Sequence, residues 1–360
     1  MGYEKFCKIF FSIIFIFVSI NLIIWNFFTK DILTNSSDKH TGDLSRMSYL
    51  TNLNFERKNL RTLEKKMIDI NSYNSQNIDM ITIGDSFSNG GAGGENRYYQ
   101  DYLATKSNLN ILNLHNLPNS RNSLETIVYL NNSGFLEKNK VKFILVECVP
   151  WAIFERFSFD LDVTKNMDIN EIYKMYGFNT SKEEIKENLL PDVSFINTGN
   201  FKFLAYNFLY NFSDKAFFSS VYKAQLDDNY FSLDKKDLIF YTNDIKYLRK
   251  INDENLRVVN DNLNVLSDLL SKSNIKLIFM PAVNKYDLYS PYIINNKYPK
   301  DELFDKFRKL DKKYIFVDTK KILATQLEKK EKDIFYIDDA HWSFKASDFI
   351  TTELSKELSK

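Results

Sequence analysis

A serine in the first third of the chain and a histidine near its end carry the side chains needed for nucleophilic catalysis. Ser86 lies in a Gly-Asp-Ser triplet, and His341 comes shortly after the adjacent Asp338 and Asp339. A serine hydroxyl becomes a good nucleophile when a histidine takes its proton and a carboxylate holds that histidine in the correct tautomer. The sequence therefore offers a serine, histidine and aspartate triad, with Asp338 and Asp339 as alternative third members.

The small number of histidines narrows the choice of base. The triplet alone does not establish catalysis, because Asp and Ser at this place also commonly cap a helix. The chain has three histidines: His40 in a polar stretch, His115 after an expected strand, and His341 beside the two aspartates. We expect His40 to be solvated, His115 to be a hydrogen-bonded loop residue, and His341 to be the base.

The composition argues against several other kinds of chemistry. The two cysteines, Cys7 and Cys148, form no Cys-x-x-Cys pair, and no His-Glu-x-x-His motif is present. We therefore expect no metal and no other cofactor, and Cys148 should be a core residue. Forty-eight basic and 47 acidic residues give a formal charge of +1, so no nucleic acid partner is expected.

Short apolar runs rich in β-branched residues alternate with longer segments of helical periodicity. The expected strands are 78–83, 109–114, 142–149, 275–282 and 314–317, and the expected helices include 124–136, 256–270, 302–310 and 346–358. This alternation predicts an α/β fold with a mainly parallel sheet and helices on both faces. Ser86, Glu147 and Lys285 would lie at the carboxyl edge of that sheet, where open α/β sheets place their sites.

The N-terminus contains a segment that is long and apolar enough to cross a membrane. Residues 9–29 carry no ionisable side chain, and a spanning helix needs about 20 residues. Lys5 and Lys8 precede it, which favours a cytoplasmic N-terminus at residues 1–8 and a chain outside the cytoplasmic membrane after residue 30. The segment lacks a small-x-small cleavage site, so we expect an uncleaved single-pass anchor rather than a signal peptide.

Two stretches do not follow the strand and helix alternation. Residues 30–75 are polar and mixed in charge, and we expect a tether leading into a surface helix before a catalytic domain at 76–360. Residues of about 150–250 are rich in aromatic side chains, and we expect an inserted helical cap. Its rings would pack a small core or stack on sugar rings. The glycine-rich stretch 90–94 is expected to be a mobile loop.

The serine and histidine blocks resemble those of the SGNH (GDSL-type) hydrolase superfamily, whose fold is a three-layer, flavodoxin-like sheet with helices. The chain is similar in particular to the O-acetyltransferases of alginate and cell-wall polysaccharides. Their blocks read Gly-Asp-Ser-Phe and, after a tyrosine, Asp-x-His-Trp, as do 84–87 and 336–342 here. The resemblance covers roughly 76–150 and 255–358. In the alginate proteins the two blocks come in the opposite order, whereas this chain has the order of ordinary SGNH enzymes.

The resemblance implies roles for individual residues. The acetyltransferase block Asp-x-His points to Asp339 as the third triad member, whereas ordinary SGNH hydrolases use Asp-x-x-His, which points to Asp338. The backbone N–H of Ser86 would serve in the oxyanion hole, with Asn119 and Ser120 as further candidates against a plain turn role. Substrate-binding candidates are Lys285, Tyr286, Glu147 and Trp342, and for Lys285 and Glu147 the alternative is a solvated strand end.

These inferences combine into a predicted function. We expect a membrane-anchored, extracytoplasmic serine O-acyltransferase that moves an acyl group, acetyl above all, onto a surface polysaccharide or cell-wall polymer through an acyl-enzyme on Ser86. Because acetyl-CoA is not expected outside the cell, the resemblance implies a polytopic membrane acyltransferase as the acyl donor. Two alternatives stay open: a carbohydrate esterase that removes acetyl groups, and a non-catalytic glycan-binding or scaffold protein of the envelope.

Overall fold

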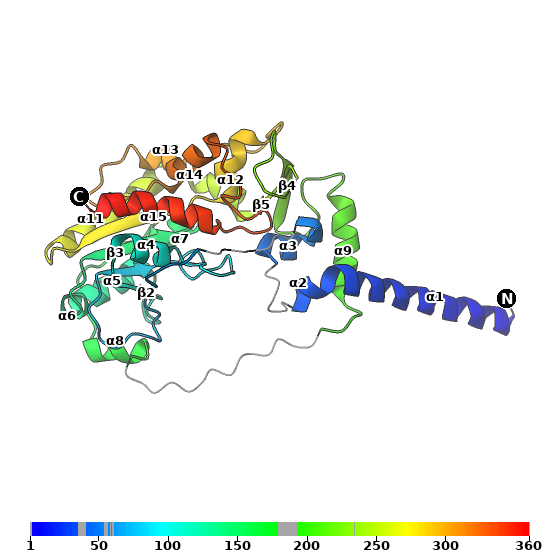
Figure 1. Cartoon of the computed structure of the whole chain (residues 1–360), viewed down its shortest axis with the longest axis horizontal. Helices are drawn as coiled ribbons and strands as arrows, with labels where there is room; N and C mark the ends of the chain where they lie inside the picture. The colour runs from blue at the N-terminus through cyan, green and yellow to red at the C-terminus, as the bar shows by residue number, and fades with distance from the viewer. Residues whose placement is uncertain are drawn as a thin grey trace.

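The computed structural model describes residues 2–34, 41–53, 57, 59, 61–178, 193–233 and 235–359. An α/β body carries a long N-terminal helix that projects away from it (Figure 1). His40, which we expected to be solvated, lies outside the described residues.

A five-stranded parallel sheet forms the centre of the body, with strand order β2-β1-β3-β6-β7. The strands are β1 (Met80–Ile83), β2 (Ile111–Leu114), β3 (Phe143–Cys148), β6 (Lys276–Pro281) and β7 (Ile315–Phe316). All five predicted strands are thus confirmed, each slightly shorter than expected. The three inner strands are almost wholly buried, which explains why they read as continuous apolar runs.

The path of the chain distributes helices over both faces of this sheet. The chain moves outward from β1 to β2 and then back past β1 to β3, β6 and β7. Right-handed crossovers therefore place α4 (Tyr99–Ser107) on one face, and α5 (Ser123–Asn132) and α11 (Asp253–Ser271) on the other. The last helix, α15 (Phe344–Leu358), packs against α4, and α14 (Thr319–Glu328) packs against α15.

The predicted helices are confirmed in position but not always in length. The segment 124–136 is divided into α5 and α6 (Phe135–Lys138), because Gly134 between them has a positive φ of 78° and interrupts the helix. The segment 302–310 forms only the short α13 (Leu303–Phe307).

The aromatic-rich stretch after β3 contains strands as well as helices, so the expectation of a purely helical cap is wrong. Its helices are α7 (Pro150–Phe157), α8 (Ile169–Met175), α9 (Thr198–Leu209), α10 (Asn243–Lys246) and a 3-10 turn at Tyr247–Lys250. Its strands β4 (Val221–Gln225) and β5 (Asp237–Tyr241) form a separate antiparallel pair. Alternation along these strands puts rings such as Phe240 into contact with Tyr286 and Tyr298 of the body.

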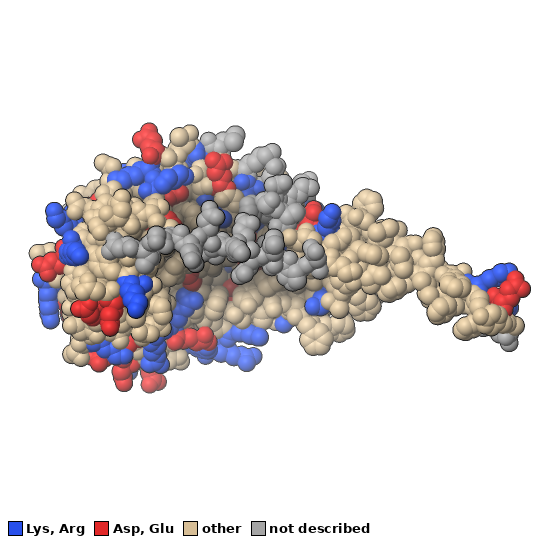
Figure 2. Space-filling view, turned by 90° about the horizontal axis from the view of Figure 1, so that it is seen from below, with Lys and Arg blue, Asp and Glu red and all other residues tan. Residues whose placement is uncertain are grey.

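The apolar N-terminal segment forms one continuous helical rod. It comprises α1 (Tyr3–Ile24), a π-helical turn η1 (Trp25–Thr29) and α2 (Lys30–Thr34). This rod is long and apolar enough to cross a membrane by length and composition. Figure 2 shows a projection without charged side chains along its middle, with Lys, Arg, Asp and Glu at its free end and where it meets the body.

The segment expected to be a tether is instead part of the body. Helix α3 (Asp43–Ser48) buries Leu44 and Ser45, and Arg57 is also buried. Residues 61–75, all of them described, contain no helix, so the expected surface helix does not form there. The backbone of this segment bonds to the sheet instead of forming a helix, because Ile68 pairs with β2 beside Leu112 and covers the edge of the sheet.

Candidate active site

Ser86 lies in a tight turn at the carboxyl end of β1, where its side chain is exposed. The turn begins at Gly84, and a Cβ there would lie 2.2 Å from Ser88 Oγ and 2.4 Å from Glu147 Oε2. A glycine is therefore required at position 84, because any larger residue would push the serine turn away from β3.

Glu147, near the end of β3, fixes the serine turn by hydrogen bonds to Asp85 and Ser88. Its Oε2 accepts hydrogen bonds from the Asp85 N–H at 2.9 Å, the Ser88 N–H at 3.2 Å and the Ser88 hydroxyl at 2.9 Å. Complete burial, with a further contribution from the Asp85 carboxylate, raises the pKa of Glu147 well above its usual range. Asp85 in turn accepts hydrogen bonds from the Val149 N–H and from Arg156.

The structure brings Ser86, His341 and Asp339 into one chain of hydrogen bonds. Ser86 Oγ lies 2.7 Å from His341 Nε2, and His341 Nδ1 lies 2.6 Å from Asp339 Oδ1. Asp339 Oδ1 also accepts the backbone N–H of His341 at 2.9 Å, which fixes the carboxylate beside the ring. Burial lowers the pKa of His341, but the Asp339 carboxylate outweighs this effect, and the net pKa is raised above 6.5.

The loop that carries His341 is supported by a buried lysine. Lys285 Nζ donates hydrogen bonds to three carbonyl oxygens of this loop: Tyr336 at 2.7 Å, Ile337 at 2.8 Å and Asp339 at 3.0 Å. Burial lowers the pKa of Lys285 to about 7, yet three acceptors match the three N–H groups of the ammonium form. The lysine therefore shapes the loop and does not reach the serine.

Arg57 joins the two adjacent aspartates in a buried ionic cluster. Its Nη1 and Nη2 donate to the two oxygens of Asp338 at 3.2 and 3.0 Å, and Nη2 also donates to Asp339 Oδ2 at 2.9 Å. The guanidinium stacks on the Tyr336 ring, 4.6 Å from its centroid. Asp338 is fully buried and also accepts the Gly42 N–H at 2.9 Å.

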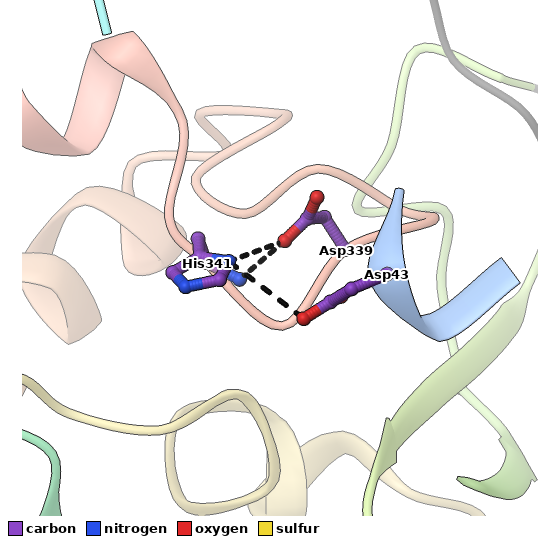
Figure 3. Close-up of side chains that lie close together, drawn as sticks. All are labelled: Asp43, Asp339 and His341. Carbon is purple, nitrogen blue, oxygen red and sulfur yellow. Dashed lines mark hydrogen bonds and ion pairs between the residues drawn. The ribbon is translucent and has the colours of Figure 1, made fainter. Parts of the chain in front are cut away.

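A third carboxylate, Asp43, approaches the same histidine from α3. Its Oδ2 lies 3.8 Å from His341 Nδ1, and its Oδ1 accepts the Ala340 N–H at 2.8 Å. Figure 3 shows Asp43 and Asp339 on the same side of the imidazole, both toward Nδ1, one from α3 and one from the histidine loop. Partial burial and the Asp339 carboxylate raise the pKa of Asp43 to about 7, although His341 acts in the opposite direction.

Asp43, Asp339 and His341 also have the residue types of a metal site, since one ligand atom from each lies within 4.8 Å of the others. Two ligands of one zinc ion lie about 3.3 Å apart in tetrahedral geometry with bonds near 2.0 Å. His341 Nδ1 and Asp339 Oδ1 are only 2.6 Å apart, which is a hydrogen-bond distance. A metal would have to separate them, so the geometry fits the triad better than a metal centre.

Ser86 and His341 open into a pocket of about 560 Å³, within the range of small-molecule sites. Its other walls come from α2, α3, the start of α7, β5 and the turn before α12, through Leu33, Met47, Trp151, Tyr241 and Asn284.

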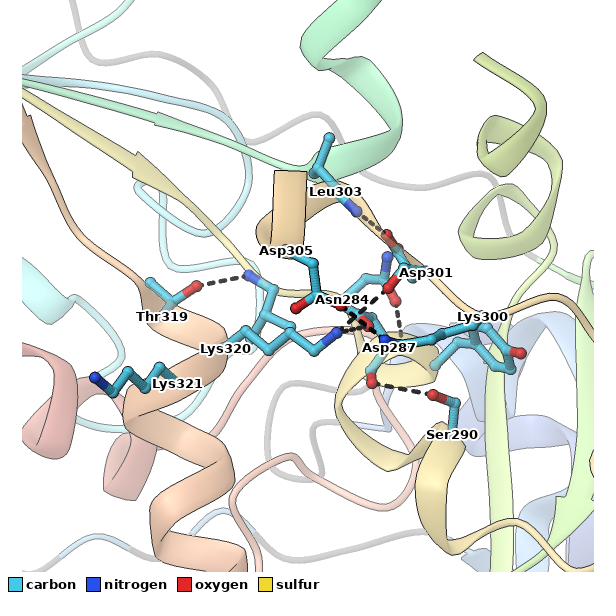
Figure 4. A network of polar contacts seen from close by, with 12 residues as sticks. Asn284, Asp287, Ser290, Lys300, Asp301, Leu303, Asp305, Thr319, Lys320 and Lys321 are labelled. Carbon is cyan, nitrogen blue, oxygen red and sulfur yellow. Dashed lines mark hydrogen bonds and ion pairs between the residues drawn. The ribbon is translucent and has the colours of Figure 1, made fainter. Parts of the chain in front are cut away.

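The part of the pocket wall formed by Asn284 is held in place by a network of hydrogen bonds and ion pairs. Asn284 caps α12 (Lys285–Tyr289) by accepting the Asp287 N–H at 2.8 Å. Figure 4 shows Asp287 paired with Lys320 of α14, and Asp301 beside them. This network fixes α12, and α12 carries the Lys285 that supports the histidine loop.

The other residues predicted to bind substrate or the oxyanion lie away from the pocket walls, which corrects those assignments. Besides Lys285 and Glu147, described above, Tyr286 is buried with its hydroxyl on the Pro299 carbonyl, and Trp342 packs on Phe87. Asn119 is exposed, and the Ser120 hydroxyl bonds to the Leu117 carbonyl and to Thr126. His115 is an exposed residue whose carbonyl accepts the Tyr176 hydroxyl, and Cys148 is buried in β3.

The glycine-rich stretch 90–94, expected to be a mobile loop, packs directly against the histidine. A Cβ on Gly91 would lie 2.6 Å from His341 Nε2, so only glycine fits beside the ring. The Ala92 carbonyl accepts Arg57 Nε at 2.6 Å, which ties this loop to the ionic cluster.

Sequence reasoning missed Asp43 and Arg57. Both lie in the polar segment interpreted as a tether, and no motif distinguishes them from its other charged residues. Arg57 is 281 residues from Asp338, so the contact is visible only in three dimensions. The one available signal was the adjacent pair Asp338 and Asp339, because two neighbouring buried carboxylates need a cation.

No protein-family model matches this chain, and no curated protein matches it.

Proposed function

We propose that this protein is a membrane-anchored serine O-acyltransferase of SGNH type, which transfers an acyl group, expected to be acetyl, to hydroxyl groups of a surface polysaccharide or cell-wall polymer. The observation that carries the proposal is the contact chain from Ser86 through His341 to Asp339 at the mouth of a pocket. If the protein were the non-catalytic glycan-binding or scaffold protein considered above, these three side chains would have no need to lie together.

The geometry supports a two-step mechanism. In the first step Ser86 Oγ attacks the donor carbonyl carbon while His341 Nε2 takes the serine proton. The donor leaving group departs with that proton, and an acyl-enzyme results. In the second step an acceptor hydroxyl attacks the acyl carbon and gives its proton to Nε2, which then returns it to Ser86 Oγ as the acyl bond breaks. Asp339 keeps Nδ1 protonated and the ring oriented, and the Ser86 N–H would help to stabilise the oxyanion.

The helical rod at the N-terminus supports membrane anchoring. Lys5 and Lys8, which precede it, favour a cytoplasmic N-terminus with the catalytic body outside the cytoplasmic membrane. A donor on the outer side would then be a polytopic membrane acyltransferase that passes the acyl group across. Protease added to wall-stripped cells should digest the chain beyond the anchor. Full protection of that part would contradict the extracytoplasmic assignment and, with it, the glycan substrate.

The nucleophile is tested by trapping the acyl-enzyme. The full-length protein is incubated with an activated acetyl ester and its intact mass is measured; one added acetyl group is expected. Ser86→Ala and His341→Ala should both abolish the adduct. Ser120→Ala is the matched control, because this serine lies outside the pocket, and it should keep the adduct. An adduct on Ser86→Ala protein would remove the mechanism.

An acetyl esterase is the second candidate function, favoured by the exposure of Ser86 to solvent. Both functions share the acyl-enzyme and differ only in whether water or a sugar hydroxyl attacks it. Adding an oligosaccharide acceptor to the preformed acyl-enzyme separates them. A transferase yields acetylated oligosaccharide, whereas an esterase releases acetate at a rate that the acceptor does not change.

A further inference from the structure

An exposed apolar surface lies on α9, next to the N-terminal rod. Outside that rod, the described residues include eleven large hydrophobic side chains that are exposed, and eight of them lie between residues 195 and 218. Phe201, Leu204 and Phe208 are spaced along one face of α9, and Phe212, Phe217 and Phe218 follow it. Phe218 is 94% exposed. A soluble surface rarely concentrates such side chains without a function.

The opposite face of α9 is fixed to the rod at η1. Asn200, nearly fully buried, bonds to the Thr29 hydroxyl and donates to Asn21 Oδ1 at 3.0 Å. Phe203 stacks on Phe28 with ring centroids 4.7 Å apart. Gly199 allows this close approach, because a Cβ there would lie 2.6 Å from Leu33. The two helices are therefore one unit.

The position of this contact places α9 at the outer boundary of a membrane. About 20 helical residues cross the hydrocarbon core, so a span that starts at Ile9 ends near Phe28, within η1. Figure 1 shows that α9 runs across the rod and not along it. A helix in that orientation and at that depth lies in the plane of the interface. Between Phe195 and Phe212 the one charged residue is Lys202, which is exposed and suits anionic lipid headgroups.

We propose that α9 and the following turns, with Phe201, Leu204, Phe208, Phe212, Phe217 and Phe218, form a membrane-docking surface that inserts into the outer leaflet beside the anchor. This inference rests on the membrane anchoring in the proposed function, but not on catalysis. The pocket lies close to the lipid, because its residues Ile32 and Leu33 follow Phe28 by four and five residues, a rise of roughly 6–8 Å along the helix, and docking would hold the body in this position. The acyl donor and the polymer acceptor would then both reach the pocket at the membrane surface.

Spin labelling of the full-length protein in liposomes of phosphatidylethanolamine and phosphatidylglycerol tests this surface. Single labels are placed at Phe208→Cys and Phe218→Cys in a Cys7→Ser background, in which buried Cys148 does not react. A label at Ile14→Cys reports on the anchor, and one at Val265→Cys is the control, an exposed apolar site on α11. Collision with dissolved oxygen and with a water-soluble nickel complex is measured at each site.

We expect the labels at 208 and 218 to resemble that at 14, with an oxygen-to-nickel ratio severalfold higher than at 265. If 208 and 218 resemble 265 while 14 stays in lipid, the docking surface is wrong and the anchor stands. If 14 is also exposed to water, both the docking and the anchoring part of the proposed function are wrong. Shielding of 208 and 218 from both reagents would mean that a second copy of the protein covers the face, and would also overturn the proposal.

Discussion

The turn that carries Ser86 and the loop that carries His341 are held in place by different means. The turn continues a central strand, and its backbone N–H groups bond to the single buried carboxyl of Glu147. The loop follows no strand, and two buried basic side chains hold it: Arg57 from the first part of the chain, and Lys285 from a helix about 50 residues before the loop. The nucleophile is thus positioned by the sheet, whereas the base is positioned by ionic contacts between distant segments.

The largest effect should come from the carboxylate that touches the base. Asp339→Asn replaces the carboxylate that keeps His341 Nδ1 protonated by a neutral amide, which also allows the wrong tautomer, and should reduce the rate of acyl-enzyme formation on the order of 10⁴-fold. Asp338→Asn is the matched control, because Asp338 contacts Arg57 and not the ring, and should lower the rate far less. Rapid-quench mass measurement gives both rates. If Asp338→Asn has the larger loss of rate, the Asp-x-x-His block of ordinary SGNH hydrolases applies here, and the esterase alternative is favoured.

Loss of the buried cation should destabilise the base side of the site. Arg57→Met leaves Asp338 and Asp339 buried without their partner and should lower the free energy of unfolding by about 3–5 kcal/mol. Arg61→Met provides the comparison, because Arg61 is about half exposed in its ion pair with Asp348 and the pair contributes about 1 kcal/mol or less. Denaturant titration in detergent micelles measures both. Equal losses would contradict the ionic role assigned to Arg57.

The nucleophile side should tolerate neutralisation of its carboxyl. Burial raises the pKa of Glu147 well above its usual range, which favours the uncharged form, and Glu147→Gln keeps an acceptor for the turn. We expect its unfolding free energy to change by less than about 1 kcal/mol, whereas Glu147→Ala should lose about 1–3 kcal/mol by leaving buried donors unpaired. A large loss in Glu147→Gln would show that the turn depends on charge as the loop does.

The smallest effect concerns the pH dependence of the base. His341 must be neutral to accept the serine proton, so activity falls as the pH drops through its raised pKa. Asp43→Asn removes a carboxyl 3.8 Å from Nδ1 whose pKa of about 7 leaves it only partly charged at acidic pH. The pKa of His341 should therefore fall only slightly, and the acidic limb of the rate profile should move slightly to lower pH. The profile with a soluble acetyl ester measures this shift. An unchanged or upward shift would contradict the electrostatic coupling.

The parts that the sequence predicted are those determined by local pattern. Each expected strand is present, because runs such as 78–83 are buried on both faces and must be apolar throughout. Ser86 follows the first of these strands, so its place at the sheet edge came directly from the strand prediction. His341 was selected by the scarcity of histidine, and Asp339 was preferred over Asp338 because of the resemblance to the acetyltransferase block; the structure brings both to Ser86.

The parts that the sequence did not predict depend on contacts between distant residues. The charged residues in 30–75 were expected to be solvated. Arg57 is buried all the same, because Asp338 and Asp339 near the other end of the chain compensate its charge. Lys285 was expected near substrate, but its three N–H groups are fully used by loop carbonyls. A one-dimensional pattern records that a residue is charged and does not record which partner removes it from water.

The ionic cluster also sets an order of events during synthesis. Arg57 leaves the ribosome early, and its partner Asp338 is made 281 residues later. At 5–20 residues per second this interval is roughly 15–60 s. Throughout it the nascent chain carries Ser86 without its base, because His341 lies three residues beyond Asp338. The contact between Ser86 and His341 can form only when the C-terminal end has emerged and returned to the segment that was made first.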